Sequence, residues 1–312
     1  MNGYLPEGLS WDHSTATDPH FTMQALSKIK EKRQILEGQV ILCDAQMNLH
    51  VLFGNIKGII PRDEVVYNPG GEPVKDIAIL TRVGKNVCFH ITHFFEENGE
   101  IKAILSRKSA QKQCHQHKIL RLCPGDIIRA RVTHLESFGA FLDIGCGIIS
   151  LLPIDSISVS RISHPNLRLS VGEIVDVIVK SIDEQGRVYV TRKELLGTWE
   201  ENAALFSAGE TVPGIIRSIE SYGIFVELTP NLTGLAELKE GLSVNESAAV
   251  YIKSIIPERM KIKLVILDSA GRHMKYAKRN YPSFPSASDK EHITYWRYSP
   301  MGASKLIETY FE

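Results

Sequence analysis

The chain has 312 residues, of which 43% are hydrophobic, and its 36 basic and 36 acidic side chains cancel to a formal net charge of zero. This length suits two to four domains, the apolar content excludes a wholly disordered chain, and the charge balance argues against coating nucleic acid through bulk charge. No apolar run approaches the ~18 residues that a membrane-spanning helix needs.

Several other classes of protein are also disfavoured. Residues 1–14 lack the basic start and apolar stretch of a secretory signal, and the five cysteines are scattered without CxxC spacing, so we expect a cytoplasmic protein with reduced thiols and no membrane partner. Cys114, His115, His117 and Cys123 lie close together in sequence, but their spacing matches no zinc finger or ribbon. No phosphate-binding loop and no GxSxG or HExxH signature is present. We therefore expect no metal, no cofactor and no catalytic residue.

The chain opens with an N-terminal segment, residues 1–35, that is predicted to be helical. Thr22–Leu36 places Leu26, Ile29 and Ile35 near one face of a helix. A first β unit is predicted at residues 36–108, because several of its short segments resemble segments of the later units.

A basic linker is predicted next, at residues 109–122. From Ile101 to Gly125 there are six Lys or Arg residues and no acid. Such a run is either the solvated face of a linker helix or a phosphate contact, and the lack of acids tips the interpretation towards phosphate.

The middle unit, residues 123–193, reads as five short strands. The strands are predicted at Ile127–Leu135, Phe141–Ile144, Ile148–Leu152, Ile174–Ile182 and Val188–Val190. Short strands separated by glycine-bearing turns indicate a small closed barrel.

The middle unit is repeated further along the chain. A helical linker is predicted at residues 194–206, followed by a third β unit at 207–268 and a basic and aromatic tail at 269–312. Residues 124–152 match residues 208–236 at an offset of 84, so that PGDIIRARVTHLESFGAFLDIG faces AGETVPGIIRSIESYGIFVELT. The loop that follows is eleven residues shorter in the third unit, a change that loops tolerate and core strands do not.

These residues carry a resemblance to a known family. The middle unit closely resembles the S1-type RNA-binding domain in the strings PGDIIRARVTHLESFGAFLDIGCGIISLLP and VGEIVDVIVKSIDEQGRVYVTRKE, and the three-unit arrangement is similar to the short S1-like proteins of Gram-positive bacteria. The resemblance covers about two thirds of the chain. It implies an all-β protein of three small five-stranded OB-fold barrels in tandem, joined by helical linkers.

The resemblance also implies an RNA-binding face made of two aromatics on the second strand, a histidine on the third, and an Asp/Arg pair around the last turn. The middle unit keeps Phe138, Phe141, Asp183 and Arg187 but has Pro153 in place of the histidine. The third unit keeps Tyr222 and Phe225, has Glu237 in place of the histidine, and retains only Lys261 near the arginine position. In the first unit, Met47 and His50 lie near the aromatic positions. We expect the middle unit to hold most of the RNA and the third unit to hold the rest.

Alternative interpretations remain open for each feature. Phe138 and Phe141 could belong to the core, and their opposite parity would split them across both faces of a regular strand unless Gly139 allows a bulge or twist. Asp183 and Arg187 could be an ordinary surface pair across a turn. The cluster Tyr295-Trp-Arg-Tyr298 is expected to pack against the third barrel as a cap, with a second stacking surface as the alternative.

The expected function is non-catalytic binding of single-stranded RNA, including mRNA, in translation with the 30S ribosomal subunit. Stacking on aromatic rings predicts low sequence specificity because every base has a π-face. Two alternatives stay open: an adaptor in RNA decay or processing, and a scaffold that docks a protein partner through the first repeat and the tail.

Overall fold

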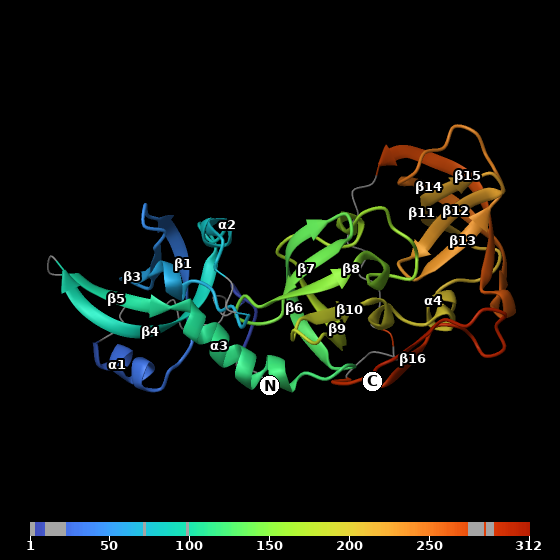
Figure 1. The fold of residues 1–312 in the computed structure, drawn as a ribbon. Helices are drawn as coiled ribbons and strands as arrows, with labels where there is room; N and C mark the ends of the chain where they lie inside the picture. Colours follow the sequence, from blue (N-terminus) through green and yellow to red (C-terminus); the bar gives the residue numbers. More distant parts are fainter. Residues whose placement is uncertain (1–3, 10–22, 71–72, 98–99, 274–283, 285–289) are drawn as a thin grey trace. The chain divides into compact units, whose positions relative to one another are not determined.

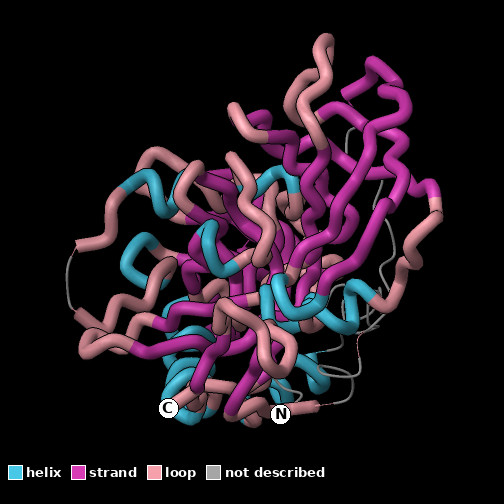
Figure 2. The backbone as a smooth tube through the Cα atoms, turned by 90° about the vertical axis from the view of Figure 1, so that its right-hand side faces the viewer, coloured by secondary structure: helices cyan, strands magenta, loops and turns pink. Residues whose placement is uncertain are grey.

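The structure, a computed structural model, describes residues 4–9, 23–70, 73–97, 100–273, 284 and 290–312. Strands dominate it (Figure 2) and close into three five-stranded barrels, with one further two-stranded sheet. The expected β-rich architecture built from five-stranded barrels is confirmed. Across the described residues, every helix is too short or too polar to cross a bilayer.

The chain divides into two compact units, which are described separately. The first comprises Met1–Leu122, Arg129–Arg131 and Asp143–Ile149, and the second comprises Cys123–Ile128, Val132–Leu142 and Ser150–Glu312.

The first unit contains the barrel of the weakest repeat. Its strands, in the order in which they neighbour one another, are β1 (Leu36–Cys43), β2 (Leu49–Phe53), β3 (Ile56–Ile60), β5 (Glu100–Ser106) and β4 (Asn86–Glu97). β4 and β5 continue beyond the barrel as a long hairpin (Figure 1). Phe53, Phe89, Leu49, Ile60 and Leu105 fill the interior and are at most 1% exposed. Burial of these side chains stabilises the closed barrel, although its sequence is the least similar of the three repeats.

The helices of the first unit differ in extent from their predictions. They are α1 (Met23–Glu31), η2 (Arg62–Glu64), α2 (Asp76–Leu80), α3 (Arg107–His117) and η3 (Ile119–Arg121). The predicted helix to Leu36 ends at Glu31, because Arg33 adopts a left-handed backbone conformation (φ 48°) that an α-helix cannot accommodate and Leu36 already begins β1. The predicted basic linker lies largely within α3 and η3, and Ser106 caps α3 by accepting a hydrogen bond from the Ser109 amide at 2.9 Å.

A buried ion pair ties the start of the chain to α3 within the first unit. The Arg107 guanidinium donates to both carboxylate oxygens of Glu7, from Nε at 2.7 Å and from Nη2 at 2.9 Å, and the Cys88 amide donates to Glu7 at 3.1 Å. Burial raises the pKa of Glu7, but Arg107, the Cys88 amide and Arg82 together outweigh burial and hold the pKa below its ordinary value. The Glu7 amide in turn donates to Asp143 at 2.7 Å. Arg107, a cation of the basic run between Ile101 and Gly125, therefore stabilises the fold.

The second unit contains most of the middle barrel and the whole described part of the third barrel. The middle barrel is formed by β10 (Val188–Thr191), β8 (Ile149–Pro153), β7 (Gly139–Asp143), β6 (Ile127–Glu136) and β9 (Ile174–Ile182), with the short helices η4 (Ile154–Ser156) and η5 (Pro165–Leu167). The third barrel is formed by β11 (Thr211–Glu220), β12 (Gly223–Thr229), β13 (Leu232–Ala236), β15 (Lys261–His273) and β14 (Glu246–Ile256), with η7 (Pro257–Arg259). Both barrels have the same order of strands, as the offset of 84 residues predicts.

The segment predicted as one linker helix is two short helices. η6 (Lys193–Leu196) ends at Gly197, whose φ of 82° is a conformation that favours glycine, and α4 (Trp199–Ala203) then begins at Thr198. Thr198 and Glu201 form a reciprocal capping box. The sequence pattern missed the break, because Gly197 and the cap impose a new helix start.

The described part of the tail packs against two barrels: Ile293 and Phe311 contact Ile178 of the middle barrel, and other aromatic side chains enter the core of the third. β16 (Tyr295–Arg297) and β17 (Glu308–Tyr310) form the two-stranded sheet, and Trp296 and Tyr298 lie in the core cluster of the third barrel at 3% and 6% exposure. The Tyr298 hydroxyl donates to the Asn231 carbonyl. The expectation that this aromatic cluster acts as a cap agrees with this packing. Residues 274–279, which carry most of the tail's basic run, lie outside the described residues.

Replacing Arg107 by Leu should reduce the free energy of unfolding by about 3–5 kcal/mol, because the Glu7 carboxylate stays buried without its cation. Urea denaturation measures the loss. Lys108→Leu, the neighbouring cation whose side chain is 46% exposed, should cost less than about 1 kcal/mol. The double replacement Glu7→Leu with Arg107→Leu should recover much of the loss, and a fully stable Arg107→Leu variant would contradict the role of the pair.

Replacing Trp296 by Ala should cost about 3–5 kcal/mol, because the indole fills part of the third barrel's core. Tyr295 is the matched control, since it precedes Trp296 on β16 and is 42% exposed. Tyr295→Ala should leave the thermal unfolding midpoint nearly unchanged. Equal effects of the two substitutions would show that the tail does not contribute to the core.

Candidate nucleic-acid interface

Two aromatic rings stand together on the outside of the middle barrel. Phe138 is 55% exposed and occupies the turn between β6 and β7, whereas Phe141 lies within β7 and is half-buried. Their ring centroids are 6.0 Å apart with planes at 89°, an edge-to-face contact. Leu142, in the opposite phase to Phe141, is fully buried. The parity problem disappears because Phe138 precedes the strand, where side chains no longer alternate between faces.

Gly139 is required at this turn by the close approach of the next strand. A Cβ atom at Gly139 would lie 2.6 Å from the Leu152 carbonyl oxygen, nearer than real Cβ contacts come. The Phe138 carbonyl accepts a hydrogen bond from the Ile154 amide at 2.9 Å, which fixes the backbone of the ring-bearing turn. Phe138 therefore points its ring outwards, whereas Gly139 lies where the crossing of β7 and β8 leaves no room for a side chain.

Two further rings lie on β6 and β10 of the same barrel, and the sequence interpretation missed both. The His134 ring on β6 lies 6.3 Å from the Phe141 ring at an interplanar angle of 25°. Tyr189 on β10 is half-buried and pairs with Leu151 on β8. We call His134, Phe138, Phe141 and Tyr189 the ring face.

The missed rings differ in how far the sequence could have revealed them. Tyr189 could have been predicted from the sequence, because Val188 and Val190 on either side of it are buried and strand alternation points its side chain outwards. His134 could not have been predicted from the sequence, because it lies two residues after buried Val132 and regular strand alternation would turn both side chains inwards. In the third barrel a register shift lies between Ile216 and Ser218, the positions aligned with Val132 and His134. Such a bulge resets which side chains face outwards.

Asp183 and Arg187 form a pair across the turn that leads into β10. The Arg187 Nε donates to Asp183 Oδ2 at 2.8 Å, and Asp183 Oδ1 accepts the Arg187 amide at 2.8 Å and the Gln185 amide at 3.0 Å. The hydrogen bond from the Arg187 amide, together with the guanidinium, lowers the pKa of Asp183. Asp183 thus closes the turn, while the Arg187 side chain remains 65% exposed. An exposed planar cation two residues before Tyr189 is placed to meet phosphate or a base plane.

The third barrel carries a similar but smaller aromatic cluster. Tyr222 is 68% exposed and Phe225 is half-buried, with centroids 6.0 Å apart and planes at 87°. Across the sheet, Phe225 pairs with Ser218 on one side and Leu235 on the other, and Leu235 pairs with Lys263. Ser218 and Lys263 therefore stand at the places that His134 and Tyr189 take in the middle barrel.

The remaining candidates in the third and first barrels are isolated from aromatic pairs of this kind. Lys261 is exposed at the start of β15 and pairs with Ile256. In the first barrel, Met47 lies in a left-handed turn (φ 65°), and His50 contacts Asp44 at 3.1 Å. That barrel's own pair of phenylalanines, Phe53 and Phe89, is buried in its interior.

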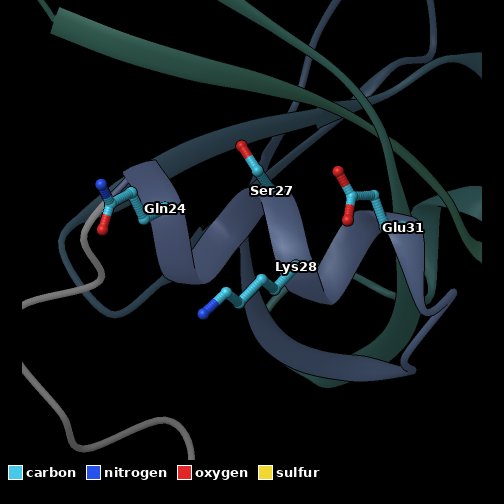
Figure 3. A pocket seen from close by; sticks show the side chains of 4 residues that line it. All are labelled: Gln24, Ser27, Lys28 and Glu31. Atoms are coloured by element: carbon cyan, nitrogen blue, oxygen red, sulfur yellow. The ribbon is translucent and has the colours of Figure 1, made fainter.

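Two other surfaces of the first unit offer few groups that could bind a single-stranded nucleic acid. In the basic run, Lys118 Nζ donates to the carbonyls of Tyr4 at 2.9 Å and Ile144 at 2.7 Å, so it joins Arg107 in holding the fold together. A pocket on α1 is lined by Gln24, Ser27, Lys28 and Glu31 (Figure 3). Its lining has one cation, one acid and no aromatic ring, so base stacking is not supported there.

Comparisons with known proteins agree with this geometry. The family model of the S1 RNA binding domain matches residues 122–193, which include the whole ring face. The chain is 28% identical over 196 residues to small ribosomal subunit protein bS1 of Leuconostoc lactis, and 31% identical over 173 residues to that of Staphylococcus aureus strain N315. These matches cover 61% and 54% of this chain, and the chain spans less than half the length of those relatives, 45% and 43%.

A solved structure is also similar in part. It is a multidomain protein with nucleic acid binding domains from Streptococcus pneumoniae, 14% identical, with 76% of this chain and 74% of that chain covered. Its TM-score of 0.25 is too low to support an inference about this chain.

The placement of the rings outside the core predicts how their loss affects stability. Phe138→Ala should change the free energy of unfolding by less than about 1 kcal/mol, since more than half of the side chain is already in water. Leu142→Ala, four residues on and fully buried, should cost about 2–5 kcal/mol. Urea denaturation of the two variants compares them directly, and a Phe138→Ala loss as large as that of Leu142→Ala would return Phe138 to the core.

Proposed function

We propose that this chain, which carries an S1 RNA binding domain at residues 122–193, binds single-stranded RNA on the ring face of its middle barrel and secondarily on the third barrel, without catalysing a reaction. The observation that carries the proposal is the edge-to-face pair of exposed Phe138 and half-buried Phe141, neither of which is a buried core residue. We further propose that each of the three barrels is an OB-fold domain of the tandem array.

The chemistry of the face favours unpaired RNA over duplex. Bases in a single strand can leave their stack and lie on aromatic rings, at ~1–3 kcal/mol per base, whereas duplex bases cannot. Arg187 adds one exposed cation beside the rings. Stacking tolerates every base, so low sequence preference follows.

The relatives support a role in translation. The similar proteins from Leuconostoc lactis and Staphylococcus aureus are small ribosomal subunit proteins. We propose that this chain brings mRNA to the 30S subunit in the cytoplasm. An adaptor that delivers RNA to a nuclease uses the same face, so co-sedimentation with 30S subunits, with and without ribonuclease, separates the two roles.

One observation favours a protein partner at the first barrel. The positions aligned with the aromatic pairs hold Met47 and His50, and the neighbouring strands expose three apolar side chains instead: Ile41 and Leu42, each 51% exposed, and Leu52, 38% exposed. We propose that the first repeat docks protein rather than RNA. Protection of the amides of residues 47–61 on titration with RNA would contradict this assignment.

RNA binding is tested by fluorescence anisotropy of a labelled, unstructured oligouridine. Phe138→Ala with Phe141→Ala should weaken binding by at least about tenfold, because two stacking rings are lost. Tyr222→Ala with Phe225→Ala should weaken it less. Val171→Ala is the control, an apolar side chain of the middle repeat that is 64% exposed and outside the ring face.

Salt provides a second readout of the same titration. Binding should weaken only moderately as salt rises, since few phosphates are neutralised. Unchanged affinity in the Phe138 and Phe141 double variant, combined with a steep salt dependence, would move the RNA site to the basic segments.

A further inference from the structure

We propose that His134 is a third base-stacking residue of the middle barrel, and that its ring makes the middle barrel a tighter RNA site than the third. The inference rests on the proposed function and deepens it, because it assigns the ligand of His134 as an unpaired base of single-stranded RNA.

The position of the ring supports stacking. His134 projects from β6 with its side chain 61% exposed, and its plane lies only 25° from that of Phe141 on the neighbouring strand. Phe138 is the other aromatic neighbour of Phe141, and the planes of these two rings meet at 89°. Three rings from β6, the turn and β7 thus form one continuous aromatic surface, where a base can contact the outer face of each.

The ring is held in place before any ligand arrives. His134 Nε2 lies 2.6 Å from Glu136 Oε1, two residues along the same strand. A hydrogen bond of this kind fixes the orientation of the imidazole and lowers the entropy lost when a base stacks on it. Because a carboxylate already occupies Nε2, we assign the contribution of His134 to its ring face rather than to a charge on phosphate.

The third barrel provides a natural comparison. Ser218, 84 residues after His134, pairs directly with Phe225, which is 84 residues after Phe141. Ser218 has no ring, so the third barrel keeps an edge-to-face aromatic pair without the third member. The two barrels therefore differ at this position in the feature that the proposal makes decisive.

Three substitutions in the full chain separate stacking from other roles of His134. With the labelled oligouridine, His134→Ala and His134→Gln should both weaken binding by about fivefold or more, the loss of one stacked base. His134→Phe, which keeps a ring but no imidazole nitrogen, should stay within about twofold of the original affinity, since stacking tolerates any aromatic ring. Thermal unfolding checks that each variant is folded.

A gain of affinity tests the same idea in the other barrel. In a chain that already carries Phe138→Ala and Phe141→Ala, the third barrel keeps its edge-to-face aromatic pair while the middle barrel has lost its own. Ser218→His should tighten its binding by about fivefold, because an imidazole is placed across the strand pair from Phe225. Ser218→Gln is the matched polar control and should give no gain.

The outcomes distinguish the inference from the proposed function. Failure of the unmodified chain to bind oligouridine would overturn the proposed function itself. Binding that is lost in the Phe138 and Phe141 double variant but unchanged in His134→Ala would overturn only the role of His134. That role is also overturned if His134→Gln binds normally or if His134→Phe binds as weakly as His134→Ala, since the ring would then not be the contributing group.

Discussion

The close crossing of β7 and β8 at Gly139 is the constraint on which the ring face depends. With only 2.6 Å between a hypothetical Cβ and the Leu152 carbonyl, the position accepts no side chain, and the residue before it must lie in a turn outside the barrel. The same arrangement recurs at Gly223, where the Ala236 carbonyl is 2.7 Å away. Leu142 and Ile144 already fill the interior, so the rings have no place there. A requirement of backbone packing thus yields an exposed aromatic surface.

Fewer cations of the basic run are available to contact phosphate than the sequence suggests. The cations of the basic run that looked suited to phosphate include Arg107, which is buried against Glu7, and Lys118, which is bonded to two backbone carbonyls. Desolvating these groups costs free energy, and the hydrogen-bond partners of each group offset that cost. The cation best placed beside the rings is Arg187, itself held by Asp183. A face built this way presents more aromatic surface than positive charge.

Much of the fold and part of the site follow from local patterns. The repeat at an offset of 84 residues predicted matching barrels, and strand alternation accounts for the burial of Leu142 opposite Phe141. Features that depend on irregular backbone were missed: the left-handed Arg33 that shortens α1, the break at Gly197, and the outward turn of His134. Parity predicts orientation only within regular strands, and each of these residues lies where regularity ends. The packing of Trp296 depends on contacts distant in sequence, which no short pattern encodes.

The insertion of Trp296 and Tyr298 into the third barrel also affects how that barrel is made. All five of its strands are synthesised by residue 273, yet two of its buried aromatic side chains come only afterwards. A nascent third barrel must therefore wait with an incomplete interior until elongation passes residue 298, while the middle barrel's strands have long since left the synthesising machinery. Until then the third barrel exposes the apolar surface that Trp296 and Tyr298 later cover.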